Sequence, residues 1–291
     1  MVACARAVGT PPTSPARRPL AHTPQGFPDT DGPASVKQAA AASILADSNQ
    51  YAPAAGLPEL RAALADHATT YAGVPVDADR GVLVTAGATE ALAAALLALV
   101  CPGDEARRAR KGFGVVRAGK GGQYCQRTRS QQHPLRPPTL HTFLPHPPTP
   151  PITRCKVVLL DPAYDSYAPV IRAAGGVPVS LRLDEGAGWA LPAEGEVRAA
   201  FRPGVTKALV LNTPHNPTGK VFAPPELALL AACVAACPGC VAVLDEVYEH
   251  LVHPGGAHAS LAALPGMEGR CVRIGSAGKT FSLTGWKARG G

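Results

Sequence analysis

Short apolar runs that alternate with helix-like segments constrain the fold of this chain most strongly. The runs are VLVTA, VVLLD, VPVSLRL, KALVLN, VAVLD and CVRIG. Helix-like segments separate most of them, at 58–71, 89–100, 166–175, around Glu196 and at 225–236. Apolar strands that are joined through helices are typical of parallel sheets covered on both faces. The sequence therefore predicts an α/β fold in which helices sandwich a mainly parallel sheet.

Polar residues gather where these predicted strands end. They are Gly87–Glu90 after VLVTA, Asn216 after KALVLN, Asp245 and Tyr248 after VAVLD, and Ser276 and Lys279 after CVRIG. The carboxyl ends of parallel strands lie at one edge of the sheet, where ligands bind. A carboxylate can keep a pyridine nitrogen protonated, a lysine can form a Schiff base, and a helix N-terminus can bind a phosphate. Together these groups favour pyridoxal 5′-phosphate (PLP) as the cofactor.

Two of these residues have other interpretations when taken alone. Asp245 is also compatible with a helix N-cap. Gly278-Lys279-Thr280 resembles the end of a phosphate-binding loop of the form G-x-x-x-x-G-K-[ST], but Arg273 stands where that loop needs its first glycine. Lys279 is then either an exposed surface lysine or a lysine used covalently.

The net charge of +7 is concentrated in one segment. Residues 106–156 contain eleven Lys or Arg, eight Pro and no Asp or Glu, which leaves 17 basic and 21 acidic residues elsewhere. Such a segment could contact nucleic acid or an SH3-like partner, but it lacks the interleaved aromatic residues that stack on bases. We predict a disordered basic, Pro-rich insertion and no nucleic-acid partner. The apolar run Ala91–Val100 is too short for a membrane span, so we expect no membrane partner either.

The N-terminus and the cysteines each leave two interpretations. The first 28 residues lack acidic residues and contain Arg, Ser and Thr, which fits a transit peptide or an arbitrary tail. The expected location is cytoplasmic, or plastid or mitochondrial if the tail is a transit peptide. Cys233, Cys237 and Cys240 suggest a metal or redox site, or buried thiols in a reducing compartment. We favour buried thiols and expect no metal.

Several blocks of sequence resemble one enzyme family. They are QGFPDTDGPASVKQAA, NQYAPAAGLPELRAALADH, VTAGATEALAAALLALVCPGDE, VVLLDPAYDSY, LNTPHNPTGKVF, LDEVYEHL and SAGKTFSLTGWK. In this order they are similar to the class I/II, fold-type I aminotransferases, and most similar to the kynurenine/glutamine aminotransferase branch. The resemblance covers nearly all of residues 25–105 and 157–287.

The resemblance implies a role for each matching residue. Lys279 would be the Schiff-base lysine and proton shuttle, Asp245 would pair with the pyridine nitrogen, and Tyr248 and Asn216 would hydrogen-bond the ring hydroxyl. Tyr164 would stack on the ring. The phosphate would be bound by Ala88, Thr89, Ser276 and Lys287, and by Tyr51 across a dimer interface. Gly26 and Asn216 would contribute to substrate binding.

These roles imply a PLP-dependent transaminase. It would move an amino group from an L-amino acid, kynurenine- or glutamine-like, to a 2-oxo acid, and it would be a homodimer. Cysteine-S-conjugate β-lyase chemistry on the same scaffold is the alternative. An inactive fragment or a mispredicted gene product is another.

The chain departs from the family pattern at two places. Residues 106–156 interrupt a short family connection and look like translated intron sequence, or else are a lineage-specific loop. After TGWK the family continues into a further strand of the sheet, most of the small domain and a carboxylate-binding arginine, whereas here ARGG follows. The expected organisation is a tail (1–25), an N-terminal segment of the small domain (26–50), and a PLP-binding large domain (51–105 and 157–291) that is incomplete at the C-terminus. We expect this chain to be a poor catalyst on its own.

Overall fold

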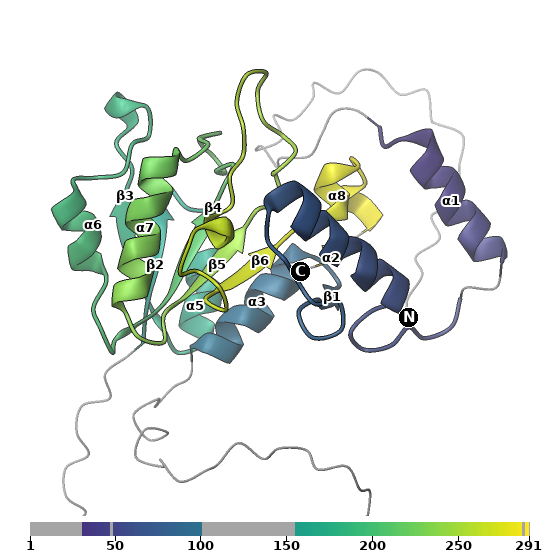
Figure 1. Cartoon of the computed structure of the whole chain (residues 1–291), viewed down its shortest axis with the longest axis horizontal. Helices are drawn as coiled ribbons and strands as arrows, with labels where there is room; N and C mark the ends of the chain where they lie inside the picture. Colours follow the sequence, from purple (N-terminus) through teal and green to yellow (C-terminus); the bar gives the residue numbers. More distant parts are fainter. Residues whose placement is uncertain (1–30, 47–48, 101–154, 287–288, 291) are drawn as a thin grey trace, which may run out of the picture.

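The computed structural model describes residues 31–46, 49–100, 155–286 and 289–290. Its helices are α1 (Ala34–Leu45), α2 (Pro58–Ala72), α3 (Ala88–Leu99), α5 (Tyr167–Ala173), α6 (Glu194–Ala200), α7 (Pro224–Ala236) and α8 (Ala277–Thr280) (Figure 1). Three short 3-10 turns are η1 (Glu185–Ala187), η2 (Leu261–Ala263) and η3 (Thr284–Trp286). The strands are β1 (Val84–Thr85), β2 (Lys156–Asp161), β3 (Val177–Arg182), β4 (Thr206–Asn212), β5 (Val241–Asp245), β6 (Cys271–Ile274) and β7 (Arg289–Gly290).

A five-stranded parallel sheet forms the centre of the molecule. Its strand order is β3-β2-β4-β5-β6. The register places Asn212 at the end of β4 beside Asp245 at the end of β5, and Asp245 beside Ile274 at the end of β6. Because all five strands are parallel, these three chain ends leave the sheet at the same edge. This confirms the predicted α/β class and the mainly parallel sheet.

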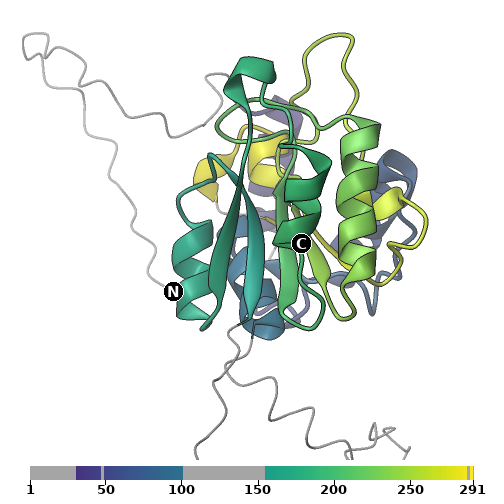
Figure 2. The same ribbon diagram turned by 90° about the vertical axis from the view of Figure 1, so that its left-hand side faces the viewer.

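Helices cover both faces of this sheet. Alternate residues of β2 face opposite sides, so Val157 and Leu159 pack with α3 and α5, whereas Val158 and Leu160 pack with α6 and α7. Figure 2 shows α5 and α7 on opposite sides of the strands. The chain steps one way along the sheet from β2 through α5 to β3, and the other way from β3 through α6 to β4 and through α7 to β5. Right-handed crossovers require these two directions of travel to use opposite faces.

Local sequence explains where the main elements begin and end. Helix α7 starts with two prolines, which are tolerated in a first turn, and the Glu226 side chain accepts a hydrogen bond from the backbone N–H of Ala223 at 2.9 Å. Helix α2 also starts with a proline, and Gly73 follows its last residue with a φ of 68°, the left-handed conformation that glycine adopts most easily. The predicted elements from 58 to 71, 89 to 100 and 157 to 274 all form, with boundaries shifted by a few residues.

The run VLVTA departs from the prediction. Only Val84 and Thr85 form a strand, β1, which pairs antiparallel with β7 in a separate two-stranded sheet. Within the described residues no strand pairing joins β1 to the five-stranded sheet, and β1 and β7 are each only two residues long. The pairing places β7 beside the strand that leads to α3.

The predicted insertion and tail lie almost entirely outside the described residues. Of residues 106–156 the structure describes the last two. Cys155 is buried, and Lys156 begins β2. The insertion was therefore predicted to end two residues too late, because Cys155 and Lys156 already belong to the apolar strand run. Helix α1 was not predicted, and none of its residues is buried. No helix in the described part of the chain is long and apolar enough to cross a membrane.

Candidate active site

The polar residues predicted to act together leave the sheet at neighbouring strand ends. The direction of travel along the sheet reverses between β2 and β4, which makes this a topological switch point. In open α/β sheets, ligands bind outside the carboxyl ends of the strands at such a point. Asn212, Asp245 and the chain that leads from β6 to Lys279 all lie at this edge.

Asp245 is fixed by a tyrosine from the opposite side of the switch point. The Tyr167 hydroxyl, at the start of α5, donates a hydrogen bond to Asp245 Oδ2 at 2.6 Å. Tyr167 is buried, and burial and then the charge of Asp245 raise its pKa well above the usual value, so the hydroxyl stays protonated and remains a donor. Asp245 is followed by a turn and caps no helix. The N-cap interpretation of Asp245 is therefore wrong.

Asn212 at the end of β4 connects the Asp245 backbone to the loop that carries Asn216. Asn212 is buried, and its side-chain amide donates to the backbone carbonyl of Asp245 at 2.7 Å. Its side-chain oxygen accepts the backbone N–H of Asn216 at 2.6 Å. Asn212 thus holds the loop that carries Asn216 against the residue that carries the carboxylate. The neighbouring His215 is buried and contacts Thr218 Oγ1 through Nδ1 at 2.8 Å.

Lys279 lies beside Tyr248. Its Nζ is 5.4 Å from the centroid of the Tyr248 ring, within cation–π range. Ser276 is buried and caps α8, the short helix that carries Lys279, by accepting the backbone N–H of Lys279 at 3.3 Å. Lys279 therefore follows β6 as Tyr248 follows β5. An amine and a phenol that were predicted to share one site thus lie side by side.

The N-terminus of α3 lies over the same half of the sheet. Helix α3 packs against β5 and β6. Gly87 precedes it with φ 117° and ψ 153°, a conformation that favours glycine. Glu90 in the first turn accepts the backbone N–H of Ala86. Ala88 is half-buried and Thr89 is exposed, so the free end of this helix faces outward from the core.

The remaining predicted residues differ in how the structure places them. Tyr164 is 41% exposed, and its ring meets that of Tyr167 edge-on with centroids 5.6 Å apart. Tyr167 in turn bonds Asp245, so Tyr164 is linked to Asp245 through one intervening side chain. Tyr51 is fully exposed, and within the described residues no hydrogen bond, ion pair or ring contact joins it to the others. Gly26 and Lys287 lie outside the described residues.

Sequence reasoning missed Tyr167 and Asn212. Asn212 carried a signal, because a polar residue at the end of an apolar strand is buried and needs hydrogen-bond partners. Tyr167 sits in the block DPAYDSY, where only Tyr164 was singled out. A buried charged cluster behind Tyr248 was also missed, in which Arg273 of β6 pairs with both Glu246 and Glu249. Burial alone would raise the pKa of Glu246, but His258 at 3.6 Å and Arg273 bring it below its usual value.

Comparison with known proteins defines the class. The family model Aminotransferase class I and II matches residues 24–107 and 152–288, which together make up most of the chain. The chain belongs to this family. Its solved structural neighbours include N-succinyldiaminopimelate aminotransferase from Mycobacterium tuberculosis, with a TM-score of 0.70 and 38% identity over 91% of this chain and 56% of that one. An aspartate aminotransferase from Thermus thermophilus bound to maleate gives a TM-score of 0.69 and 30% identity over 91% and 54% of the two chains.

The similar curated proteins carry several substrate names. Probable N-succinyldiaminopimelate aminotransferase DapC of Mycobacterium tuberculosis is 39% identical over 90% of this chain and 53% of its own length. Methionine aminotransferase of Escherichia coli is 34% identical over 90% and 54%. Kynurenine–oxoglutarate transaminase 1 of Homo sapiens is 35% identical over 90% and 52%. The chain thus spans about half the length of the relatives it matches.

Aminotransferases of class I and II depend on PLP, and the donor set of this chain fits that cofactor. The site supplies one amine, one carboxylate held by a buried donor, one phenol beside the amine, and the N-terminus of a 12-residue helix. These are the groups that can hold an aldehyde, a pyridinium nitrogen, a ring hydroxyl and a phosphate, respectively.

Proposed function

We propose that this chain is the PLP-binding part of a transaminase that moves an amino group from a kynurenine- or glutamine-like L-amino acid to a 2-oxo acid. The observation that carries the proposal is the convergence on one sheet edge of Asp245, bonded to Tyr167, and Lys279, beside Tyr248. When bound, PLP supplies an electron sink that lets the substrate α-carbon lose a proton.

Asp245 and Tyr167 orient the electron sink. The Asp245 carboxylate would accept a hydrogen bond from the protonated ring nitrogen and stabilise its positive charge. The Tyr167 hydroxyl, bonded to Oδ2 at 2.6 Å, restricts rotation of that carboxylate. The backbone bond from Asn212 to the Asp245 carbonyl fixes the same residue from the β4 side. Asp245 is therefore held at both its side chain and its main chain before any ligand arrives.

Lys279 would bind the cofactor covalently and move the proton. A lysine amine must be neutral to attack an aldehyde or to remove a proton from carbon. Tyr248 lies against Lys279 and, with Asn216, would hydrogen-bond the ring hydroxyl. Ser276 holds the backbone N–H of Lys279, which sets where the flexible lysine side chain begins.

The phosphate and the second subunit complete the proposal. Ala88 and Thr89 at the start of α3 would offer backbone N–H groups to the phosphate, with Ser276 and Lys287 as further ligands. We propose a homodimer in which Tyr51 of one subunit reaches the phosphate of the other, which agrees with the full exposure of its side chain. Gly26 and Asn216 would contact the substrate.

A covalent-labelling experiment tests the cofactor role directly. The 291-residue chain is incubated with PLP, reduced with borohydride, digested and examined by mass spectrometry. We expect the pyridoxyl mass on the peptide that contains Lys279, and its loss in Lys279→Ala. Lys220, which pairs with Glu226 at 2.9 Å, offers a matched control, and Lys220→Ala should keep the label on Lys279. Labelling spread over several lysines would contradict the proposal.

A substrate panel tests the finer part of the proposal. Amino transfer to 2-oxoglutarate is measured from kynurenine, glutamine, methionine and N-succinyldiaminopimelate. The proposal expects the highest kcat/KM with kynurenine or glutamine. Preference for either of the other two donors would overturn the donor assignment and leave the transaminase assignment intact. Release of pyruvate and ammonia from a cysteine S-conjugate, without transfer to the oxo acid, would favour β-lyase chemistry instead.

A further inference from the structure

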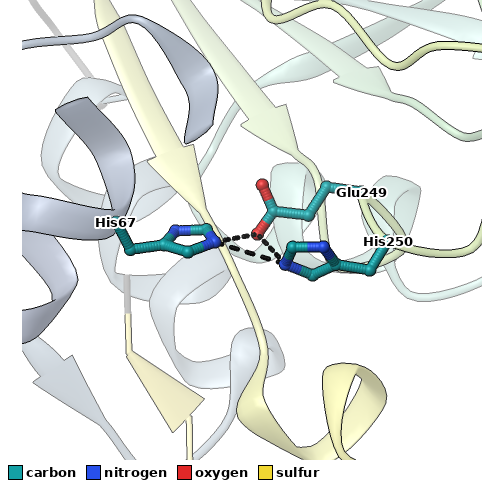
Figure 3. Close-up of side chains that lie close together, drawn as sticks. All are labelled: His67, Glu249 and His250. Carbon is teal, nitrogen blue, oxygen red and sulfur yellow. Dashed lines mark hydrogen bonds and ion pairs between the residues drawn. The ribbon is translucent and has the colours of Figure 1, made fainter. Parts of the chain in front are cut away.

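A histidine of α2 meets a glutamate and a histidine from the turn after β5. Figure 3 shows the side chains of His67, Glu249 and His250 pointing toward one another. The two Nε2 atoms lie 3.2 Å apart. Glu249 Oε1 lies 3.9 Å from His67 Nε2 and 3.8 Å from His250 Nε2. Within the described part of the chain, this is the one group of three His, Cys, Asp or Glu side chains whose possible metal-ligand atoms all lie within 4.8 Å of one another.

These separations fit the coordination sphere of a small divalent ion. Zinc binds imidazole nitrogen at about 2.0–2.1 Å in tetrahedral geometry, so two such ligands are about 3.3 Å apart. The observed separation of the two ring nitrogens is 3.2 Å. The carboxylate oxygen must approach the nitrogens by roughly half an ångström, which a rotation about the last side-chain torsion of a glutamate can supply, since that torsion is broad.

Groups around the cluster orient its ligands. The second oxygen of Glu249, Oε2, pairs with Arg273, which directs Oε1 toward the two imidazoles. The Tyr71 ring packs against both imidazoles, with centroids 5.2 Å from His67 and 4.4 Å from His250, and its hydroxyl donates to the Glu249 backbone carbonyl at 3.2 Å. Partners of this kind outside the first ligand sphere commonly fix metal ligands in place.

The protonation states suit a metal ion. Burial, reinforced by the charge of Arg273, lowers the pKa of His67. Burial also lowers the pKa of His250, although Glu249 opposes this. Both imidazoles are therefore neutral at neutral pH and offer a lone pair. The Glu249 side chain is only 4% exposed, whereas the two histidines are 35% and 30% exposed, so an ion and a water molecule can reach the nitrogens from one side.

A hydrogen bond between the two imidazoles explains less of this geometry. One Nε2 could donate to the other at 3.2 Å. Both contacts to Glu249 Oε1 are nevertheless too long for hydrogen bonds, so a bond between the imidazoles does not explain why this oxygen lies beside both nitrogens. A cation at the centre satisfies all three atoms together.

We propose that His67, Glu249 and His250 bind one divalent transition ion of the zinc type, with water as the fourth ligand. The ion links α2 to the turn after β5. Because Tyr248 directly precedes Glu249, the ion also fixes the segment that presents the Tyr248 ring to Lys279. The proposal does not depend on the proposed transaminase activity.

Zinc binding to the full 291-residue chain tests the proposal. The purified protein is dialysed against a chelator and then titrated with Zn²⁺ in competition with a chromophoric chelator. We expect one ion per chain bound at this site and a rise of at least about 2 °C in the midpoint of thermal unfolding, since the ion binds the folded state. His67→Gln and His250→Gln should each weaken the binding by more than the about 10- to 100-fold typical of losing an outer partner.

His253→Gln is the matched control, because His253 is exposed, follows His250 by three residues, and is not part of the His67, Glu249 and His250 cluster. Unchanged affinity in both His67→Gln and His250→Gln would overturn the proposal. If a variant fails to fold, X-ray absorption of the unmodified zinc-bound chain decides. A first shell of nitrogen and oxygen with two imidazoles supports the site, and sulfur in that shell would assign the ion to cysteines instead.

Discussion

The Tyr167 hydroxyl donates to Asp245 Oδ2 at 2.6 Å across 78 residues of sequence. Tyr167 starts the helix that follows β2, and Asp245 ends β5, so the bond spans the central strand β4 that separates them in the sheet. A buried neutral donor thus holds the carboxylate that ends β5 in the candidate active site. Charge-assisted bonds of this kind are shorter and stronger than bonds between neutral groups.

We expect Tyr167→Phe to weaken PLP binding by about 10-fold, which matches the loss of one hydrogen bond to a charged group. The ring and its packing remain, so the secondary structure should not change. Tyr164→Phe is the control, since Tyr164 is exposed and its predicted contribution is the stacking of its ring. Fluorescence titration with PLP measures both variants. Equal affinities in the two variants would contradict a role for the Tyr167 hydroxyl.

Asp245→Asn should separate catalysis from binding. The amide keeps the shape of the side chain but cannot stabilise a protonated ring nitrogen, so amino transfer should fall by about 100-fold or more, as for other groups that stabilise developing charge. PLP affinity should fall by no more than the about 10-fold expected for Tyr167→Phe, because the phosphate contacts are untouched. Steady-state transfer and PLP titration on the same preparation give the two numbers. Parallel losses in both would mean that Asp245 serves mainly to bind the cofactor.

Arg273→Met should destabilise the fold by about 3–5 kcal/mol, because it leaves two buried carboxylates, Glu246 and Glu249, without their shared countercharge. Arg198→Ala breaks an exposed i,i+4 pair with Glu194, which solvent screens, so it should destabilise the fold far less. Urea unfolding at neutral pH compares the two. A small effect of Arg273→Met would show that the two glutamates take up protons or water at little cost.

His215 should make the fold less stable in mild acid. Burial, with a smaller effect of Lys220, lowers the pKa of His215 to about 4. In the unfolded chain a histidine has a pKa of about 6.5. Between about pH 6.5 and about pH 4 the unfolded chain therefore binds more protons than the folded chain, so the free energy of unfolding decreases as the pH is lowered. The loss begins below about pH 6.5 and is complete below about pH 4, with an upper limit of ~3 kcal/mol.

His215→Gln should flatten this part of the stability profile, whereas His253→Gln, which changes an exposed histidine, should leave it unchanged. Urea unfolding at pH 7, 5.5 and 4 measures the difference. The same slope in the wild-type chain and in His215→Gln would show that His215 is solvated or paired when protonated.

The strands and the edge at which the polar residues meet could be predicted from the sequence. Parallel strands such as β4 and β5 contain continuous apolar runs, ALVL and VAVL, and each run is followed by a polar residue that marks the carboxyl edge. The length of β1 was overestimated, because its apolar run looks like that of a longer strand. How many residues of such a run pair depends on the neighbouring strand. Helix α1 has no buried residue, so no apolar periodicity could reveal it.

The contacts between distant side chains could not be predicted. Tyr167 and Asp245 are 78 residues apart, and His67 and His250 are 183 residues apart. No spacing rule relates such positions. Whether two of them touch depends on which way the helices pack and which rotamer each side chain adopts. Arg273 was considered only as a misfit in a nucleotide-binding motif, although its position in β6 places it against two glutamates that follow β5.

The long basic segment joins the fold at the edge of the sheet opposite to the candidate active site. Val100 after α3 and Cys155 before β2 are both buried in the same apolar cluster, at the amino end of the central strands, whereas Asp245 and Lys279 follow the carboxyl ends. A longer or shorter connection between Val100 and Cys155 therefore lies a full strand length away from the candidate active site. Replacing residues 106–154 with a short linker, or with a fused domain, should leave the PLP site intact, so this junction is a natural attachment point for engineering.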